Sequence, residues 1–456
     1  MEIEKIVQRQ KEFFEKNETK SIKFRKQSLK KLREVILKHE QEIEIAIKKD
    51  LNKSPSESYM AEIGLCLSEI SYMLKHIGTW GKNKTHLTPL SQFHAKSFES
   101  PEPYGVVLII SPWNYPFMLT IEPLIDAMAA GNCAILKPSE FSPHTSAIME
   151  KIIKNNFPEE YITVVQGEKE TCMELLNQDV DYIFYTGGTR VGKIIMQEAA
   201  KRLVPVTLEL GGKSPCIIDK TAKLEVAAKR VAFGKVLNAG QTCVAPDYLL
   251  IHKEVKEQFI ALYSKYVREF LGNNPIQNET YPHIINQKHF ARLQNLLAGE
   301  KIQMGGKANP IDRVIEPTLV EGNLAKKELQ EEEIFGPIMP VFTYETVEEA
   351  IRFVKEKEKP LALYLFTQDK KTEKKVLKEI SFGGGCINDT IIHLATSRMG
   401  FGGVGYSGMG SYHGKKGFDT FTHYRSIVKK YTYLDLPFRY MPYSKAKDKL
   451  IRLFLK

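Results

Sequence analysis

Long apolar runs are missing from this sequence. No stretch approaches the roughly 18 consecutive apolar residues that a membrane-spanning helix needs, and the densest apolar run is VVLII at 106–110. Residues 1–16 mix charges with isolated apolar side chains and lack the basic and then apolar order of a secretory signal. We therefore expect a cytoplasmic protein, or at most one that contacts a membrane at its surface.

Cysteine is also scarce, and its spacing is irregular. The six cysteines form no CxxC pair, and they stand at Cys66, Cys133, Cys172, Cys216, Cys243 and Cys386. This spacing favours reduced thiols in a cytoplasm over a disulfide framework. No metal site is predicted.

The chain carries a formal net charge of +10 but lacks a basic stripe. Much of the surplus lies in 429–456, where eight Lys or Arg residues face only Asp435 and Asp448. The rest of the chain is nearly balanced, and its basic residues are not interleaved with aromatic ones as in proteins that bind single strands. We predict no nucleic-acid partner.

The end of the chain, KAKDKLIRLFLK at 445–456, has the pattern of a basic amphipathic helix. One helical face collects Ala446, Leu450, Leu453 and Phe454, and the lysines lie elsewhere. Two interpretations are open. The segment docks on a dimer or frays, or it binds anionic membrane surfaces reversibly, as basic amphipathic helices do.

The length favours two or three domains, because single cores stop growing beyond about 250–300 residues. From about 104, the short runs VVLII, AILK, ITVV and YIFY alternate with helical patterns, which is typical of a parallel sheet with crossover helices. A second set begins with VTLEL and PCIID and predicts a second α/β unit. Residues 21–51 predict one amphipathic helix, whereas 80–101 and the part after about 415 lack either period and are expected to form arms.

Three short motifs carry residues suited to chemistry. GQTC holds Cys243 in a loop, ELGGKS begins with Glu209 at a strand end, and SPWNYP places Asn114 where strand ends converge on a site. Taken singly, each residue has an ordinary interpretation, as a buried thiol, a solvated strand end or a turn former.

Together the three motifs resemble those of the aldehyde dehydrogenase superfamily, whose nucleophile, base and oxyanion motifs occur here in the family's order. The resemblance covers essentially the whole chain and extends to KPSE, EEIFGP, IND and FGGVGYSGMGSYHGKKGFDTFTH. The last run and the short N-terminus are similar to the class 3, fatty-aldehyde branch. The resemblance implies that an aldehyde is oxidised to a carboxylic acid with NAD(P).

The resemblance also implies how the chain is divided. An NAD(P)-binding domain of Rossmann type takes 1–79 and 102–208, and an α/β catalytic domain takes 209–414. An oligomerisation arm and tail take 80–101 and 415–456, and by family analogy they build a homodimer.

Roles follow from the same resemblance. Cys243 attacks the aldehyde, the Asn114 amide and the Cys243 backbone N–H stabilise the oxyanion, and Glu209 activates the water that cleaves the thioester. Two rivals of other classes remain. A thiol hydrolase or acyltransferase without cofactor leaves KPSE and EEIFGP unexplained, and the intact catalytic residues count against an idle binding protein.

The residues expected to bind the cofactor are Lys137, Glu140, Gly187, Gly188, Val191, Gly192, Glu333 and Phe335. The Glu140 carboxylate accepts from ribose hydroxyls and repels a 2′-phosphate, so NAD is preferred and NADP is the alternative cofactor. Gly187, Gly188 and the helix start through Val191 are expected to meet the pyrophosphate.

Two residues depart from the family pattern. Gly188 stands where the family usually has serine, and Gly400 stands where it has proline. We expect the first to loosen a hydrogen bond near the cofactor and the second to make the loop beneath the substrate more mobile.

The predicted substrate wall carries no charge: Tyr115, Leu237, Thr242, Ile391, Ile392 and Phe401. This wall favours medium- to long-chain aliphatic or aromatic aldehydes over phosphorylated ones.

Overall fold

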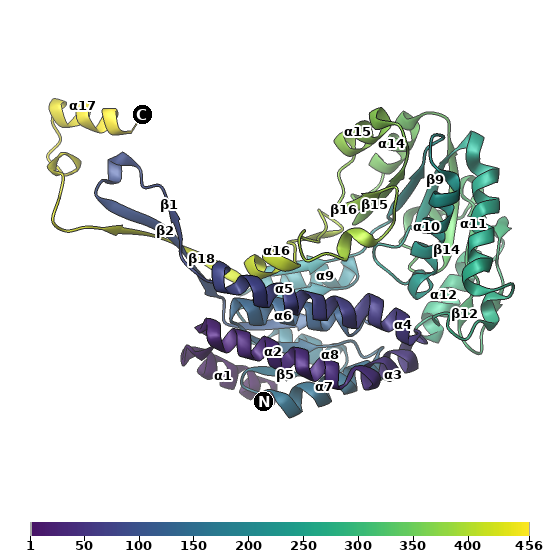
Figure 1. The fold of residues 1–456 in the computed structure, drawn as a ribbon, viewed down its shortest axis with the longest axis horizontal. Coiled ribbons are helices and arrows are strands. Elements are labelled where there is room, and N and C mark those ends of the chain that lie inside the picture. The colour runs from purple at the N-terminus through teal and green to yellow at the C-terminus, as the bar shows by residue number, and fades with distance from the viewer. Residues whose placement is uncertain (1, 456) are drawn as a thin grey trace.

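The computed structural model describes residues 2–455 and contains two large, mainly parallel β-sheets flanked by helices (Figure 1). A thin arm projects from this body, with the C-terminal helix at its far end. The α/β fold class predicted from the alternating runs is confirmed.

The first sheet has the strand order β17-β7-β6-β3-β4-β5. Its strands are β3 (Val106–Ile110), β4 (Cys133–Lys137), β5 (Ile162–Val164), β6 (Tyr182–Thr186), β7 (Val206–Glu209) and β17 (Gly408–Met409), and only β17 is antiparallel to its neighbour. The predicted runs VVLII, AILK, ITVV and YIFY lie in β3 to β6. The chain adds β4 and β5 on one side of β3 and then β6 and β7 on the other side, so the strand order changes direction between β3 and β6. Ligands of open α/β sheets bind at the carboxyl ends of the two strands where this change occurs.

Crossover helices connect these strands: α6 (Met118–Ala130), α7 (Pro143–Asn156), α8 (Lys169–Leu176) and α9 (Thr189–Ala200). The N-terminal part supplies α1 (Glu2–Glu15), α4 (Pro55–Ser58), a π-helical turn η2 (Tyr59–Ile63) and α5 (Gly64–Trp80). Every residue of α6 is buried, because α2 (Ile22–Lys38), α5, α16 (Gly414–Thr420) and the first sheet all pack against it.

The single helix predicted for 21–51 is wrong. The segment forms α2 (Ile22–Lys38) and α3 (Glu40–Leu51), which are separated at His39. The break turns the chain, so that α2 packs on α5 and α6 while α3 packs on α7. Each helix still buries its own apolar residues: Leu29, Leu32, Ile36, Ile43 and Ile47.

The second sheet has the order β10-β13-β14-β9-β8-β15-β16. Its strands are β8 (Pro215–Ile218), β9 (Tyr248–His252), β10 (Ile302–Met304), β13 (Thr318–Glu321), β14 (Ile338–Tyr344), β15 (Ala362–Phe366) and β16 (Gly384–Ile387). Its helices include α10 (Leu224–Val236), α11 (Lys256–Leu271), α12 (Gln287–Leu297), α14 (Val347–Lys355) and α15 (Lys370–Glu379). Residues 210–214 join β7 directly to β8, so the carboxyl edge of the first sheet lies near the amino edge of the second.

The arm is an antiparallel sheet of β1 (Lys84–His86), β2 (Ala95–Pro103) and β18 (Thr422–Lys430). Figure 1 shows it extending away from both large sheets, beyond α16 (Gly414–Thr420), toward α17 (Lys445–Phe454). No helix within residues 2–455 is long and apolar enough to cross a membrane.

Candidate active site

The carboxyl edge of the first sheet brings two of the predicted catalytic residues together. Asn114 follows β3, and Glu209 is the last residue of β7. The Glu209 backbone is held from both sides, because Gly187 N–H donates to its carbonyl oxygen at 2.9 Å and Gly408 pairs with it across the sheet. The Glu209 carboxylate is buried, and neither of its oxygens has a hydrogen-bond partner among the described residues.

Cys243 is carried by an unusual turn between α10 and β9. Asn238, Ala239 and Gly240 of η4 (Leu237–Gly240) have φ angles of 50°, 50° and 70°, a left-handed conformation that non-glycine residues adopt at a cost of about 1–3 kcal/mol each. Gly240 fits because a Cβ atom there would lie 2.4 Å from the Gly336 carbonyl oxygen. The strained turn changes the direction of the backbone just before Cys243.

The Gln241 side chain stabilises this turn. Its amide nitrogen donates to the carbonyls of Asn238 (3.1 Å) and His283 (3.0 Å), and its oxygen accepts from Ile285 N–H at 3.0 Å. Gln241 is fully buried, so these bonds are shielded from water. The GQTC motif is therefore anchored by its second residue.

Side-chain hydrogen bonds join the Cys243 loop to the loop after β3. Asn114 Nδ2 donates to the Gln241 carbonyl oxygen at 3.0 Å, and the Tyr115 and Thr242 hydroxyls are 2.7 Å apart. A primary amide carries two hydrogens, so the second Asn114 N–H is available to another acceptor near Cys243.

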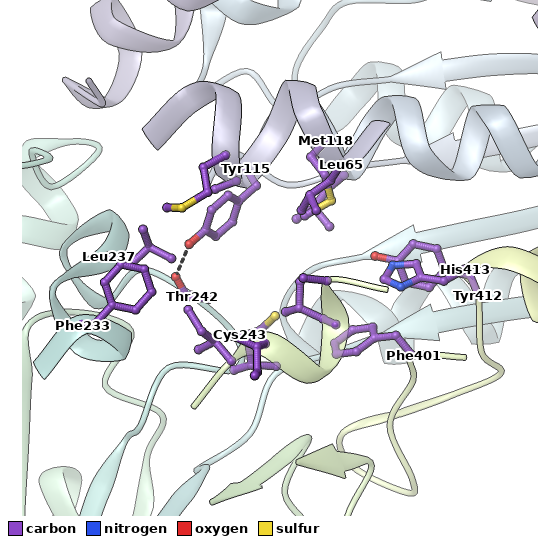
Figure 2. A pocket seen from close by; sticks show the side chains of 18 residues that line it. Leu65, Tyr115, Met118, Phe233, Leu237, Thr242, Cys243, Phe401, Tyr412 and His413 are labelled. Atoms are coloured by element: carbon purple, nitrogen blue, oxygen red, sulfur yellow. Dashed lines mark hydrogen bonds between the residues drawn. The ribbon is translucent and has the colours of Figure 1, made fainter. Parts of the chain in front are cut away.

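Cys243 lines two cavities, and the first is apolar. In Figure 2, aromatic and aliphatic side chains surround Cys243, and the dashed line joins Tyr115 to Thr242. Besides Cys243, the lining consists of Met60, Ala61, Leu65, Tyr115, Met118, Leu119, Phe233, Leu237, Thr242, Val244, Ile391, Ile392, Leu394, Ala395, Phe401, Tyr412 and His413. All six residues predicted for the substrate wall are among them.

The second cavity brings the three catalytic candidates and part of the cofactor set together. Its lining is Pro112, Trp113, Asn114, Leu119, Thr186, Gly187, Gly188, Glu209, Leu210, Gly211, Cys243, His289, Arg292, Glu333 and Phe335. Lys137, Glu140, Val191 and Gly192 lie outside both cavities. Cys243 thus stands where an apolar chamber meets a chamber built from the predicted cofactor motifs.

Burial dominates the electrostatics of the site. It raises the pKa of the Cys243 thiol to about 12, and the carboxylates of Glu333 and Glu209 act in the same direction. Burial also raises the pKa of Glu209 well above its usual range and that of Glu333 to about 8. The carboxyl groups therefore take up protons far more readily than carboxyl groups in water.

The start of α9 offers unpaired backbone amides to an anion. Gly188 is its N-cap, and no side chain caps the helix there. A Cβ atom at Gly188 would meet no atom within 4 Å, so the serine usual in the family would fit, whereas one at Gly187 would lie 2.3 Å from the Tyr185 hydroxyl. Helix N-termini of this kind bind phosphate groups.

The remaining cofactor candidates lie farther from Cys243. Lys137 ends β4 and is buried, with its ammonium 3.6 Å from a Glu140 carboxylate oxygen and 2.9 Å from the Pro138 carbonyl oxygen. Val191 is exposed on the first turn of α9, and Gly192 allows that helix to pack closely on Leu210.

Gly400, the second departure from the family pattern, is exposed, yet two side chains lie close to its backbone. A Cβ atom there would lie 2.5 Å from the Ser411 hydroxyl and 2.7 Å from Lys416 Cγ. The neighbouring Phe401 exchanges two backbone hydrogen bonds of 2.9 Å with Tyr412.

Sequence reasoning missed several residues of the site. Trp113 packs edge-on against Phe335 and lies 5.2 Å from the His289 ring, and burial lowers the pKa of His289 to about 4. Trp113 lies in the SPWNYP motif beside Asn114, whereas no sequence motif marks His289. Among residues 2–455, no group of three or more His, Cys, Asp or Glu side chains is arranged to hold a metal ion.

Comparisons with known proteins show which family the chain belongs to. The model of the aldehyde dehydrogenase family matches residues 1–427. The chain is 49% identical to a Staphylococcus aureus protein named 4,4'-diaponeurosporen-aldehyde dehydrogenase, over 98% of this chain and 97% of that one. It is 43% identical to aldehyde dehydrogenase family 3 member A2 of Rattus norvegicus, over 99% and 94% of the two chains.

Solved structures are similar as well. The substrate-bound state of Staphylococcus aureus AldH has a TM-score of 0.97 and 48% identity, and the match covers 100% of this chain and 99% of that chain. Betaine aldehyde dehydrogenase from Staphylococcus aureus, in complex with NAD+, has a TM-score of 0.85 and 26% identity over 95% and 88% of the chains. The chain therefore belongs to the aldehyde dehydrogenase family, with class 3 enzymes among its relatives, and is an aldehyde dehydrogenase.

Proposed function

We propose that this enzyme oxidises a medium- to long-chain aliphatic or aromatic aldehyde to a carboxylic acid with NAD(P), through a thioester on Cys243. The single observation that carries the proposal is that Cys243 lines both cavities, one apolar and one containing Asn114, Glu209 and Glu333. A thiol at this junction reaches an aldehyde from one side and a cofactor from the other.

Cys243 acts first, because an aldehyde gives up hydride readily only from a tetrahedral adduct. The Cys243 thiol first releases its proton to water, and the thiolate then adds to the carbonyl carbon. The resulting oxyanion lies near the free N–H of Asn114 Nδ2 and the Cys243 backbone N–H. One such donor typically contributes about 3–4 kcal/mol to transition-state stabilisation. The Gln241 contact fixes the Asn114 amide in advance, so little reorganisation is needed.

The residues of the second cavity fit a nicotinamide dinucleotide. Gly187, Gly188 and the uncapped start of α9 would hold its pyrophosphate, and Glu333 and Phe335 would hold the nicotinamide ribose and ring. Two buried atoms in this lining, Thr186 Oγ1 and Glu333 Oε1, have no hydrogen-bond partner among the described residues and suit a polar ligand. When bound, the cofactor supplies the two-electron acceptor for the oxidation.

Glu209 acts last. The thioester on Cys243 is cleaved by water, and the buried Glu209 carboxylate removes the proton from that water. Its raised pKa makes it a stronger base than a carboxylate in solvent. The product leaves as a carboxylate, and Cys243 is restored as the thiol.

The chemical class of the aldehyde is tested by initial rates. The uncharged lining of the first cavity supports apolar substrates, and the Staphylococcus aureus relative is named for 4,4'-diaponeurosporen-aldehyde. We expect kcat/KM to rise with chain length from acetaldehyde toward decanal in a panel measured with NAD and with NADP. Preference for a phosphorylated aldehyde, or thioester hydrolysis without any aldehyde-dependent NADH, would contradict the proposal.

Cofactor preference provides a second test. We propose that NAD gives the higher kcat/KM because the Glu140 carboxylate repels a 2′-phosphate, although a dog relative is named as NADP-preferring. Lys137 lies 3.6 Å from that carboxylate and partly offsets its charge. Glu140→Gln removes the negative charge that repels the 2′-phosphate. The variant is expected to narrow the NAD to NADP ratio of kcat/KM by about tenfold, which corresponds to about 1.4 kcal/mol. An unchanged ratio would show that Glu140 is not the selector.

The arm supports a proposed homodimer. Segments 80–101 and 415–456 leave apolar side chains exposed, among them Leu87 (97% exposed), Leu90 and Met441, and the dog relative is named as dimeric. We propose that a second copy of the chain covers this arm. We also propose that segments 1–79 and 102–208 form the NAD(P)-binding domain and that segment 209–414 forms the catalytic domain.

The exposed face of α17 supports reversible contact with anionic membranes. Leu450 and Leu453 of this face are exposed, and Lys445 and Arg452 stand in the first and last turns of the helix. Each basic residue near an anionic surface contributes about 1 kcal/mol. We expect the full chain to sediment with vesicles that contain phosphatidylserine, and we expect a variant lacking 445–456 to stay in the supernatant. Equal sedimentation of both would leave the helix with no membrane role.

A further inference from the structure

A buried ion pair lies behind the aldehyde cavity. Lys53 Nζ is 2.7 Å from Glu62 Oε1, and both side chains are fully buried. Glu62 Oε2 accepts from the backbone N–H groups of Phe117 (2.9 Å) and Met118 (3.3 Å) at the start of α6. Replacing such pairs by apolar residues is often neutral or stabilising, so stability alone does not account for this one.

The Lys53 ammonium also contacts the oxyanion motif directly. It donates to the Asn114 backbone oxygen at 2.8 Å and lies 3.8 Å from the centre of the Tyr115 ring. Asn114 is in neither a helix nor a strand, so the regular hydrogen bonds of the sheet do not fix its orientation. The same oxygen accepts from Asn238 Nδ2 at 2.7 Å, which ties it to the turn before Cys243.

The segment that carries the ion pair also forms part of the aldehyde cavity. The π-helical turn η2, closed by a hydrogen bond from Gly64 N–H to the Tyr59 carbonyl, places Met60 and Ala61 in the cavity lining. Glu57, on the same segment, accepts from Asn238 N–H at 2.8 Å. Residues 53–62 therefore contact the substrate cavity and both catalytic loops, and π-helical turns are frequent at functional sites.

We propose that Lys53 is a positioning residue for the oxyanion site. Its ammonium, held by Glu62, fixes the Asn114 backbone so that the side-chain amide faces the carbonyl oxygen of the bound aldehyde. The inference rests on the proposed function, because Asn114 is the oxyanion donor there. Lys53 itself lines neither cavity at Cys243.

The test is the single-turnover rate of NADH formation, with enzyme in excess over aldehyde and NAD saturating. Lys53→Met is expected to slow this rate by about 10- to 100-fold, as small displacements of catalytic groups do, while the KM for aldehyde and the Kd for NAD change by less than about twofold. Because Lys53→Met leaves Glu62 buried without its partner, the double variant Lys53→Met/Glu62→Gln is measured too. The double variant removes the unpaired charge at position 62 and should slow the reaction equally.

A cycle with Asn114→Ala separates positioning from general damage. If Lys53 acts through the Asn114 amide, Lys53→Met should change the rate by less than about twofold once that amide is gone. Lys256→Met is the matched control, because it breaks a half-buried 2.8 Å ion pair with Glu321 and neither residue lines a cavity at Cys243. Its single-turnover rate should equal that of the wild type.

The outcomes are distinguishable. A wild-type rate in the folded Lys53 variants, or an equal loss in the Asn114→Ala background, would overturn the positioning role and leave the proposed function intact. A wild-type rate in Asn114→Ala alone would overturn the oxyanion assignment of the proposed function and this inference with it.

Discussion

Replacing Cys243 by alanine is expected to abolish aldehyde-dependent NADH formation altogether. The thiol forms the only covalent bond to the substrate in the proposed mechanism, and removing the nucleophile of a covalent catalyst costs on the order of 10⁶ in kcat. Binding of NAD should persist, because the glycines at the start of α9 are untouched. The measurement pairs a spectrophotometric assay with a fluorescence titration of NAD.

Cys386→Ala is the matched control for this experiment. Like Cys243, Cys386 is half-buried, and it lies in β16 of the second sheet. Its sulfur is 3.6 Å from His393 Nδ1, so this thiol also stands beside a base. Cys386 lines neither cavity at Cys243. Full activity in Cys386→Ala is expected, whereas residual activity in Cys243→Ala would mean that the thioester forms elsewhere or not at all.

Replacing Glu209 by glutamine should separate the two halves of the reaction. Glutamine keeps the volume and a hydrogen-bonding end but has no basic oxygen, so general-base help of about 10²–10⁴-fold is lost when water attacks the thioester. Stopped-flow measurements should show a burst of NADH, up to one per active site, followed by slow turnover. A variant that binds NAD but gives no burst at any pH would show that Glu209 acts before the oxidation step.

The pH dependence of this variant follows from the raised pKa values. Glu209 works as a base only when deprotonated, and burial raises its pKa, so wild-type turnover should increase as pH rises through that value. This rising limb should vanish from the steady state of Glu209→Gln. The burst rate should instead increase about tenfold per pH unit, because the Cys243 thiol has a pKa raised to about 12 and only its thiolate attacks.

The sequence predicts that Asn114 and Glu209 lie at one edge of the first sheet, because each stands at the end of a strand. Asn114 comes after the run VVLII and Glu209 ends β7, and the carboxyl ends of parallel strands necessarily meet at one edge. Cys243 lies in a motif between a helix and a strand of the second sheet. Its distance from Asn114 was not predictable, because the Gln241 bridge depends on a left-handed turn that no local pattern specifies.

Other parts of the molecule depend on contacts between distant segments. The sequence of 80–101 has no strand period, yet β2 pairs with β18, more than 300 residues away. Lys53 and Glu62 look like ordinary surface charges of a helical segment and are fully buried. Strand β2 and the Lys53–Glu62 pair each depend on a partner from another element. Periodicity within one element carries no information about such partners.

The central claim is that the substrate is bound to Cys243 as a thioester. Its most direct test is the mass of Glu209→Gln quenched with acid in the slow phase after mixing with decanal and NAD. The account predicts one decanoyl group per chain, on the peptide that contains Cys243 and in an amount equal to the NADH burst. Acylation of another residue, or an NADH burst with Cys243 unmodified, would contradict it.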